Sequence, residues 1–206
     1  MPSFLIADIR VINREKYNEY RVQFRACVQR HGGRFLARGQ EPEVVQGGWQ
    51  SPRMVLVEFG SFEAAHAMMP SQAYRALEVA RANCAMFDIV IVDGLDTSQF
   101  SRCKSRPTYA LVDARIINRT AFEAYRERMD LAVRANSGRY LAVTEQVHTV
   151  AGNWAPTFLA ILEFPSRKQA GGTYAMPDHE AVRNLGTNAA MIDVILLSGE
   201  SPDVPI

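Results

Sequence analysis

The chain repeats itself once, and this repeat constrains its fold more than any other feature of the sequence. Residues 3–94 align with residues 108–199 at a constant offset of 105, without a gap. SFLIADIRV matches TYALVDARI, GGRFLAR matches SGRYLAV, and NCAMFDIVIVDG matches NAAMIDVILLSG. A unit this long that occurs only twice does not predict a solenoid, whose repeats are shorter and more numerous. Each copy is therefore predicted to be a small domain.

The repeat also predicts the domain boundaries. We expect a first domain at residues 1–95 and a second at residues 108–200. The segment 96–107 between them is polar and ends in Pro107, which is typical of a linker. The last residues, 201–206, contain two prolines and are expected to form a loose tail.

Composition and charge indicate an ordinary globular protein. Of the 206 residues, 48% are hydrophobic and 22% are charged, which argues against intrinsic disorder. Lys and Arg total 23 and Asp and Glu total 22, so a net charge of +1 gives no global attraction to nucleic acid or anionic membranes. No apolar run approaches the roughly 20 residues of a membrane span. The start, MPSFLIADIRV, lacks a basic region, so we expect no signal peptide and a cytoplasmic location.

Cysteine and histidine usage predicts neither a metal site nor a disulfide framework. The cysteines are odd in number and have no C-x-x-C spacing, and none of the four histidines recurs in the other copy. They are Cys27, Cys84 and Cys103, and His31, His66, His148 and His179. The chain also has no dinucleotide fingerprint, P-loop or nucleophile elbow. We therefore expect no cofactor, although one histidine could still ligate a haem.

Each copy opens with a strand that alternates in period two, followed by a helix. Alternation places Leu5, Ala7, Ile9 and Val11 on a first face, which suits packing under helices. It places Phe4, Ile6, Asp8 and Arg10 on a second face. Asn13 and Asn118 are predicted to cap the following helices, and a stripe of large residues at helical spacing follows each cap. In copy one that stripe is Tyr17, Tyr20, Phe24, Cys27 and Val28.

The rest of the copy completes a β-α-β-β-α-β order. A second strand at Arg34 to Arg38 is predicted to continue with Glu43 to Gln46 after a bend. The strand MVLVEF, a helical region broken at Pro70 (Pro177 in copy two) and the strand DIVIVDG follow. This order is that of the ferredoxin-like unit, an antiparallel sheet with both helices on one face.

The second face of each sheet would be left bare and apolar in a single copy. It carries Phe4 and Ile6 in copy one and Tyr109 and Leu111 in copy two. Soluble monomers rarely expose such a surface, so we predict that the two sheets pack face to face as an intramolecular α+β barrel. The chain would then be a monomeric pseudo-dimer, with further self-association left open.

Copy one contains several distinctive motifs: ADIRV, GGRFLARG, the G-x-W turn, VEF-S..AA, SQAYRAL and the closing V-DG. Together they resemble the domain-of-unknown-function family numbered 1330, in the dimeric α+β-barrel superfamily. Copy two keeps VDARI, GRYLA, GNW and LEFPS but departs in YAMPDHEAV, where His179 replaces a tyrosine of the family pattern. The resemblance implies a barrel that is normally assembled from two chains. Its superfamily includes cofactor-independent monooxygenases, lactone isomerases, haem enzymes and ligand sensors, so the fold does not select a function.

Two acid–base pairs are the leading candidates for a site. Asp8 with Arg10, and Asp113 with Arg115, are expected to point between the sheets. Each could anchor an anionic or carbonyl-bearing ligand, with the aspartate as a catalytic base. The alternative is a salt-bridge set that holds the sheet register, because a buried charge needs a partner.

Glutamates and tryptophans are further candidates. Glu58 and Glu163 could serve as general acids or bases near the end of the third strand, or pair with arginines such as Arg34 or Arg139. Trp49 and Trp154 lie in glycine-containing turns and could close the barrel mouths over a ligand, or simply pack under a loop. Arg10, Arg34, Trp49, Arg115 and Trp154 are the predicted ligand-binding residues.

Three functions are compatible with the sequence. The first is binding of a small metabolite in the barrel interior, without catalysis. The second is a cofactor-independent monooxygenase or isomerase of a small carbonyl or aromatic compound, with an Asp or Glu base and an arginine that holds the anion. The third is a structural or assembly module with a filled interior. Copy one keeps more of the family pattern, so a working site is expected there.

Overall fold

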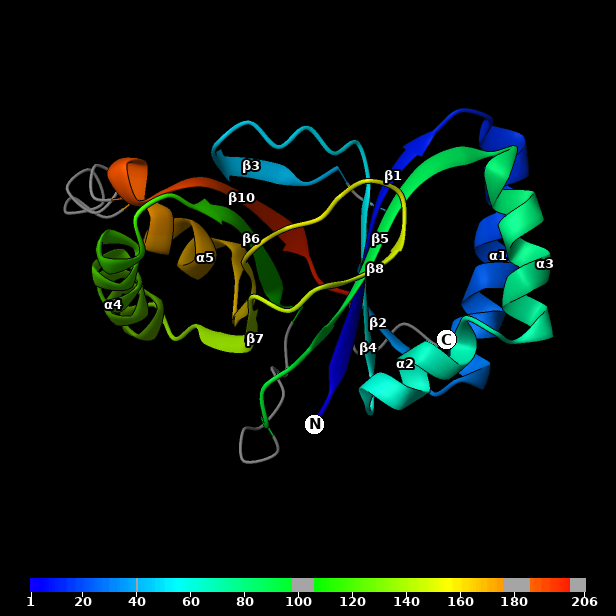
Figure 1. The fold of residues 1–206 in the computed structure, drawn as a ribbon, viewed down its shortest axis with the longest axis horizontal. Helices are drawn as coiled ribbons and strands as arrows, with labels where there is room; N and C mark the ends of the chain where they lie inside the picture. The colour runs from blue at the N-terminus through cyan, green and yellow to red at the C-terminus, as the bar shows by residue number, and fades with distance from the viewer. Residues whose placement is uncertain (40, 98–105, 176–185, 201–206) are drawn as a thin grey trace. The chain divides into compact units, whose positions relative to one another are not determined.

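The computed structural model describes residues 1–39, 41–97, 106–175 and 186–200, which form two compact units (Figure 1). Each unit contains most of one sequence repeat and a short segment of the other. Residues 42–50 of the first repeat belong to unit 2, and residues 148–155 of the second repeat belong to unit 1. The predicted linker falls mostly on residues 98–105, and the tail on 201–206; both lie outside the described residues.

Unit 1 is a five-stranded antiparallel sheet with helices on one face (Figure 1). The strand order is β2-β4-β1-β5-β8. Its elements are β1 (Ser3–Val11), α1 (Arg14–Arg30), β2 (Arg34–Arg38), β4 (Met54–Phe59), α2 (Phe62–Met68), α3 (Gln72–Ala82), β5 (Ala85–Asp93) and β8 (His148–Ala151). The helical region breaks between α2 and α3 at Pro70, as predicted.

Helix α1 begins and ends as its sequence predicts. The Asn13 side chain accepts a hydrogen bond from the backbone N–H of Lys16 (3.0 Å), which satisfies one of the donors that a helix N-terminus leaves open. The helix buries the predicted stripe of Tyr17, Tyr20, Phe24, Cys27 and Val28. These side chains pack on the first face of the sheet, against Leu5, Ala7 and Ile9.

Unit 2 repeats this architecture at the offset of 105. The strand order is β3-β10-β6-β9-β7, and one face of the sheet is covered by helices. Its elements are β3 (Glu43–Gln46), β6 (Thr108–Ile116), α4 (Arg119–Ala135), β7 (Arg139–Thr144), β9 (Leu159–Phe164), α5 (Arg167–Tyr174) and β10 (Ala190–Ser198). Asn118 caps α4 by accepting from the backbone N–H of Ala121 (3.1 Å). Pro177 and His179 lie outside the described residues.

One strand of each sheet comes from the other repeat, and here the prediction was wrong. Glu43 to Gln46 do not continue the second strand; they form β3, which pairs with β10 in unit 2. The equivalent strand β8 pairs with β5 in unit 1. Gly39, with a φ of +79°, allows the chain to turn away after β2. At its new place Glu43 forms an ion pair with Arg167 of α5.

The second face of each sheet is apolar and closed to solvent along its centre. In unit 1 the side chains on this face are at most 1% exposed; they are Phe4, Ile6, Met54, Leu56, Val90 and Val92. In unit 2 the equivalent side chains are at most 3% exposed; they are Tyr109, Leu111, Leu159, Ile161, Ile195 and Leu197. The predicted assignment of residues to the two faces is therefore confirmed. Polar groups are confined to the ends of this face.

None of the helices among the described residues combines the length and the apolar character needed to cross a bilayer.

Candidate functional site

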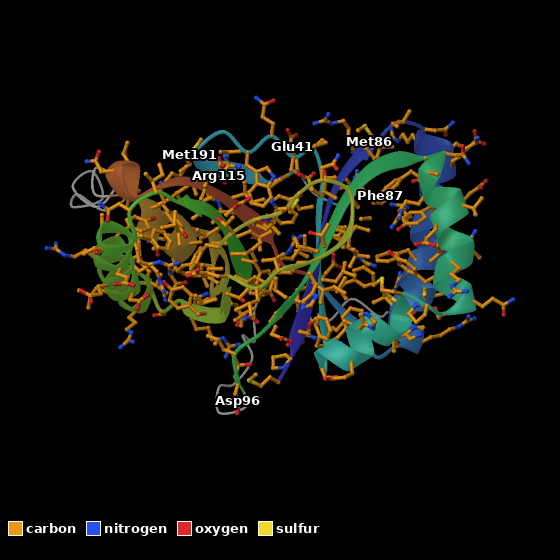
Figure 2. All side chains as sticks on the ribbon, viewed as in Figure 1. Glu41, Met86, Phe87, Asp96, Arg115 and Met191 are labelled. Carbon is orange, nitrogen blue, oxygen red and sulfur yellow. The ribbon has the colours of Figure 1, made fainter. Side chains whose placement is uncertain are left out.

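The predicted pair Asp8 and Arg10 lies at one end of the second face of unit 1. Asp8 is half-buried and accepts a hydrogen bond from the Ser51 hydroxyl (2.6 Å). It stands directly opposite Asp88 on β5, whereas Arg10 is exposed and stands opposite the exposed Met86. In unit 2, Asp113 faces Asp193, and the exposed Arg115 faces Met191 (Figure 2).

Glu58 and Glu163 lie at the other end of that face, in ion pairs. Arg34 donates to Glu58 Oε2 from Nη2 (2.7 Å) and Nε (3.1 Å), and Arg139 donates from Nε to Glu163 Oε2 (2.6 Å). The strand partners of Asp8 and Phe4 on β4 are Met54 and Glu58. Four residues of strand span about 13 Å, so the structure does not bring Asp8 and Glu58 together.

Trp49 and Trp154 are half-buried and follow the exchanged strands β3 and β8. Each turn is held by an aspartate. Asp88 Oδ1 accepts from the backbone N–H groups of Asn153 (2.6 Å) and Trp154 (3.0 Å). Asp193 Oδ1 accepts from the backbone N–H of Gly48 (2.6 Å). The sequence reasoning overlooked Asp88 and Asp193, although both stand at matching positions of the repeated closing strand.

A second group of polar side chains lies on the helix side of unit 1, where the sequence predicted only core. Its floor is a cluster of aromatic rings. The Phe87 ring contacts those of Tyr20 (centroids 5.1 Å apart) and Tyr17 (6.5 Å), and Tyr20 stacks on Phe24 (5.7 Å). Phe87 projects from β5 toward α1 and α3 (Figure 2).

Two arginines lie over these rings. The Arg53 guanidinium carbon is 5.4 Å from the centre of the Tyr17 ring, and Nη1 donates to the Gly39 carbonyl (3.2 Å). The Arg81 carbon is 5.7 Å from the centre of the Phe87 ring, and Nη1 donates to the Tyr74 hydroxyl (3.0 Å). We call Tyr17, Tyr20, Tyr74, Phe87, Arg53 and Arg81 the arginine–aromatic site.

The charges of Arg53 and Arg81 have no carboxylate partner among the described residues. Both arginines are half-buried. The phenols do not neutralise them. Burial raises the pKa of Tyr17 above its ordinary value although Arg53 acts in the opposite direction, and burial raises the pKa of Tyr74 although Arg81 opposes it. Both phenols are therefore neutral at physiological pH, and the site carries a net positive charge.

The positions in unit 2 that are equivalent to Tyr17, Arg53 and Arg81 carry no polar side chain. Phe122 and Phe158 replace Tyr17 and Arg53, and their rings pack edge to face with centroids 4.9 Å apart. Gly186 replaces Arg81; a Cβ there would lie 3.1 Å from the Tyr125 ring. Among the described residues, the arginine–aromatic site is therefore built in unit 1 and not in unit 2. The replacement of Arg53 by Phe158 between the two copies is the sequence signal that could have revealed it.

Three of the four histidines lie within the described residues. His31 follows α1, and its Nδ1 lies 2.8 Å from the Cys27 carbonyl oxygen. His66 and His148 both lie against the ring of Phe62, at 5.7 Å and 4.6 Å. Residues 1–39, 41–97, 106–175 and 186–200 contain no cluster of three metal-binding side chains. His179 and Cys103 lie outside these ranges.

Comparison with known proteins identifies the family. The profile of "Domain of unknown function (DUF1330)" matches the chain twice, at residues 2–95 and 107–200. The chain belongs to the DUF1330 family. It is a tandem member, because each half carries a complete copy of the domain. No functionally curated protein shows significant sequence similarity to it.

Solved structures establish the fold class of this DUF1330 protein. A "putative monooxygenase" from Lactobacillus acidophilus has a TM-score of 0.54 at 9% identity, covering 96% of this chain and 93% of its own. An anthrone oxidase-like protein scores 0.53 at 8% identity, covering 100% and 97%. A mutant chlorite dismutase from Candidatus Nitrospira defluvii scores 0.53 at 8% identity, covering 97% and 91%. The fold is thus α+β, two tandem repeats of the dimeric α+β-barrel class.

Proposed function

We propose that this DUF1330 protein binds a small organic anion at the arginine–aromatic site of unit 1. One observation supports this proposal most directly. The guanidinium groups of Arg53 and Arg81 are half-buried and lack a carboxylate partner among the described side chains. A charge withdrawn from water is costly unless it is paired. A ligand that carries a negative charge would supply the missing partner.

The chemistry of the site suits such a ligand. A guanidinium has five N–H donors. Among the described residues, Arg53 is hydrogen-bonded to the Gly39 carbonyl and the Tyr17 side chain, and Arg81 to the Tyr74 hydroxyl, which leaves donors unused on both. The remaining donors present the fork that matches a carboxylate or phosphate. The rings of Tyr17, Tyr20 and Phe87 supply apolar surface beside the charge, the usual composition of a metabolite site.

The residues favoured by the sequence form a rival location. A ligand at the polar end of the second face would meet Asp8 and Arg10, or Asp113 and Arg115 in unit 2. Trp154 and Trp49 follow the turns held nearby, by the opposing aspartates Asp88 and Asp193. The carboxylates there would attract a cationic or hydroxyl-bearing group rather than an anion. Glu58 and Glu163 already have arginine partners, so we assign them to stability.

Catalysis is the second candidate function. Two similar structures carry the descriptions "putative monooxygenase" and "anthrone oxidase-like protein", and a guanidinium group could hold an anion formed by proton removal. Asp8 lies on the second face of the sheet, however, while Arg53 and Arg81 act on the helix face. Asp8 therefore cannot be the base for a ligand held at the arginine–aromatic site, and we favour binding without turnover. A structural module, the third function, would bind nothing.

A thermal-shift screen of small anions, followed by calorimetry, tests the proposal. The wild-type protein should be stabilised by an anion, and the double variant Arg53→Gln/Arg81→Gln should lose at least tenfold in affinity. Arg126→Gln is the matched control, because Arg126 lies over the ring of Phe158 in unit 2 (5.5 Å). Loss of binding in Asp8→Asn/Arg10→Ala instead would place the ligand at the rival location. Oxygen consumption with a bound ligand would favour the enzyme.

A further inference from the structure

We infer that the ligand of the arginine–aromatic site is a flat aromatic carboxylate and that each chain binds one. This inference rests on the proposed function and deepens it. Its first support is the way in which the cations are held. Each guanidinium lies over a ring and donates a hydrogen bond to the protein, Arg53 to the Gly39 carbonyl and Arg81 to the Tyr74 hydroxyl.

Held in this way, the two guanidiniums are oriented before a ligand arrives. The free edge of a guanidinium binds a carboxylate through two parallel N–H···O bonds, in one plane. In an aromatic carboxylate the ring is conjugated with the acid group and extends in that plane. A flat ligand can therefore pair with a guanidinium edge and lie entirely in the guanidinium plane, whereas a puckered ring of equal size extends out of that plane.

The second support is the nature of the surrounding wall. Phe87 meets the Tyr20 ring at 60° and the Tyr17 ring at 37°, so the surface beneath the two guanidinium groups is a cluster of tilted aromatic rings. Aromatic pairs in such arrangements gain free energy beyond the area that they bury, which an aliphatic ring does not. Phe87 is 8% exposed and Tyr17 is 6% exposed, so a ligand held by the guanidinium groups would contact the small exposed parts of these rings.

The third support comes from unit 2, where the chain places an aromatic ring at the position equivalent to Arg53. Phe158, in place of Arg53, packs edge to face on Phe122 and lies under the guanidinium of Arg126. Phe158 is 4% exposed, and Gly186 leaves no room for a side chain without displacement of Tyr125. In the described part of unit 2, Phe122 and Phe158 therefore satisfy each other's aromatic contacts and the two arginines of the unit 1 site are replaced, from which we predict one ligand per chain.

Calorimetric titration with three probes of similar size tests the inference: 2-naphthoate, decahydronaphthalene-2-carboxylate and 2-naphthamide. We expect 2-naphthoate to bind once per chain, at least tenfold tighter than the other two. The variant Arg53→Gln/Arg81→Gln should weaken 2-naphthoate to the affinity of the amide, while Arg126→Gln should bind like the wild type. Circular dichroism spectra should match across the variants, so that a loss of binding is not a loss of folding.

Different experimental outcomes would contradict the inference and the proposed function. Equal affinity for the flat and the saturated acid would overturn the aromatic class while leaving anion binding intact. Two equivalent sites per chain would overturn the stoichiometry. If neither acid binds, and inorganic phosphate and the wider anion screen also produce no shift, the proposed function itself fails.

Discussion

Asp88, on the last strand of the first repeat, accepts a hydrogen bond from the backbone N–H of Trp154, which follows a strand of the second repeat (3.0 Å). The same oxygen accepts from the N–H of Asn153 (2.6 Å). Asp193 does the same for the N–H of Gly48 in unit 2. These aspartates therefore hold the turns that follow the exchanged strands.

Removing the Asp88 carboxylate should loosen the turn. Asp88→Ala leaves the N–H groups of Asn153 and Trp154 without their acceptor, and hydrogen bonds to a charged group contribute about 1.5–3 kcal/mol each. We expect a loss of about 2 kcal/mol in urea unfolding and faster hydrogen exchange at the Trp154 amide. Asp88→Asn keeps an oxygen acceptor and should lose less; equal losses would contradict this role of the carboxylate.

In the turn after β3, Gly47 is required by its backbone conformation as well as by the space around it. Gly47 has a φ of +80°, and a Cβ there would lie 2.1 Å from Asp193 Oδ1. Gly47→Ala should cost roughly 1–3 kcal/mol, because the residue is strained in this region and displaces the carboxylate. The neighbouring Gly48 has open space around its Cβ position and serves as the matched control. Gly48→Ala should change the urea midpoint little; similar effects of both changes would refute the explanation.

Substitutions that make unit 1 resemble unit 2 should abolish ligand binding and increase the free energy of unfolding. Tyr17→Phe/Arg53→Phe copies the pair Phe122 and Phe158. It removes a half-buried cation without a carboxylate partner and adds an edge-to-face ring contact. We expect a gain of about 1 kcal/mol and complete loss of 2-naphthoate binding. A variant that is destabilised and still binds would show that Arg53 is structural.

The two equivalent ion pairs should differ in their importance for stability. The Glu163 side chain is 7% exposed and that of Glu58 is 19%, while their partners Arg139 and Arg34 are 19% and 42% exposed. Breaking a buried pair leaves an uncompensated charge and costs about 3–5 kcal/mol, whereas exposed pairs contribute about 0–1 kcal/mol. In urea unfolding, Glu163→Gln should therefore be the more damaging change. The reverse order would contradict the burial argument.

Tyr125 should make the protein sensitive to alkaline pH. Burial raises its pKa from 10 to about 12, because the folded state disfavours the phenolate. The associated stability is fully present below pH 10 and is lost as pH rises to 12; two pKa units correspond to about 2.7 kcal/mol. Tyr125→Phe should flatten the fall in unfolding free energy between pH 10 and 12 relative to the wild type. Parallel profiles would show that Tyr125 does not contribute.

The sequence predicted the helices, the strand faces and the caps well, because these depend on local periodicity. Alternation alone assigned Leu5 to the helix face and Ile6 to the other. It could not predict where β3 pairs, since Glu43 to Gln46 carry no signal that separates one sheet edge from another. The arginine–aromatic site was missed for a related reason. Tyr17 and Tyr20 have the spacing of core residues, and only the folded chain brings Arg53 and Arg81 to them.

The exchanged strands have a consequence for how the chain is made. Synthesis from the N-terminus completes β5 some 55 residues before it reaches β8, the strand that closes the same sheet. Strand β5 therefore remains an unpaired edge of the first sheet until residues 148–151 have been synthesised. The order in which these strands are translated therefore differs from the order in which they lie in the sheet.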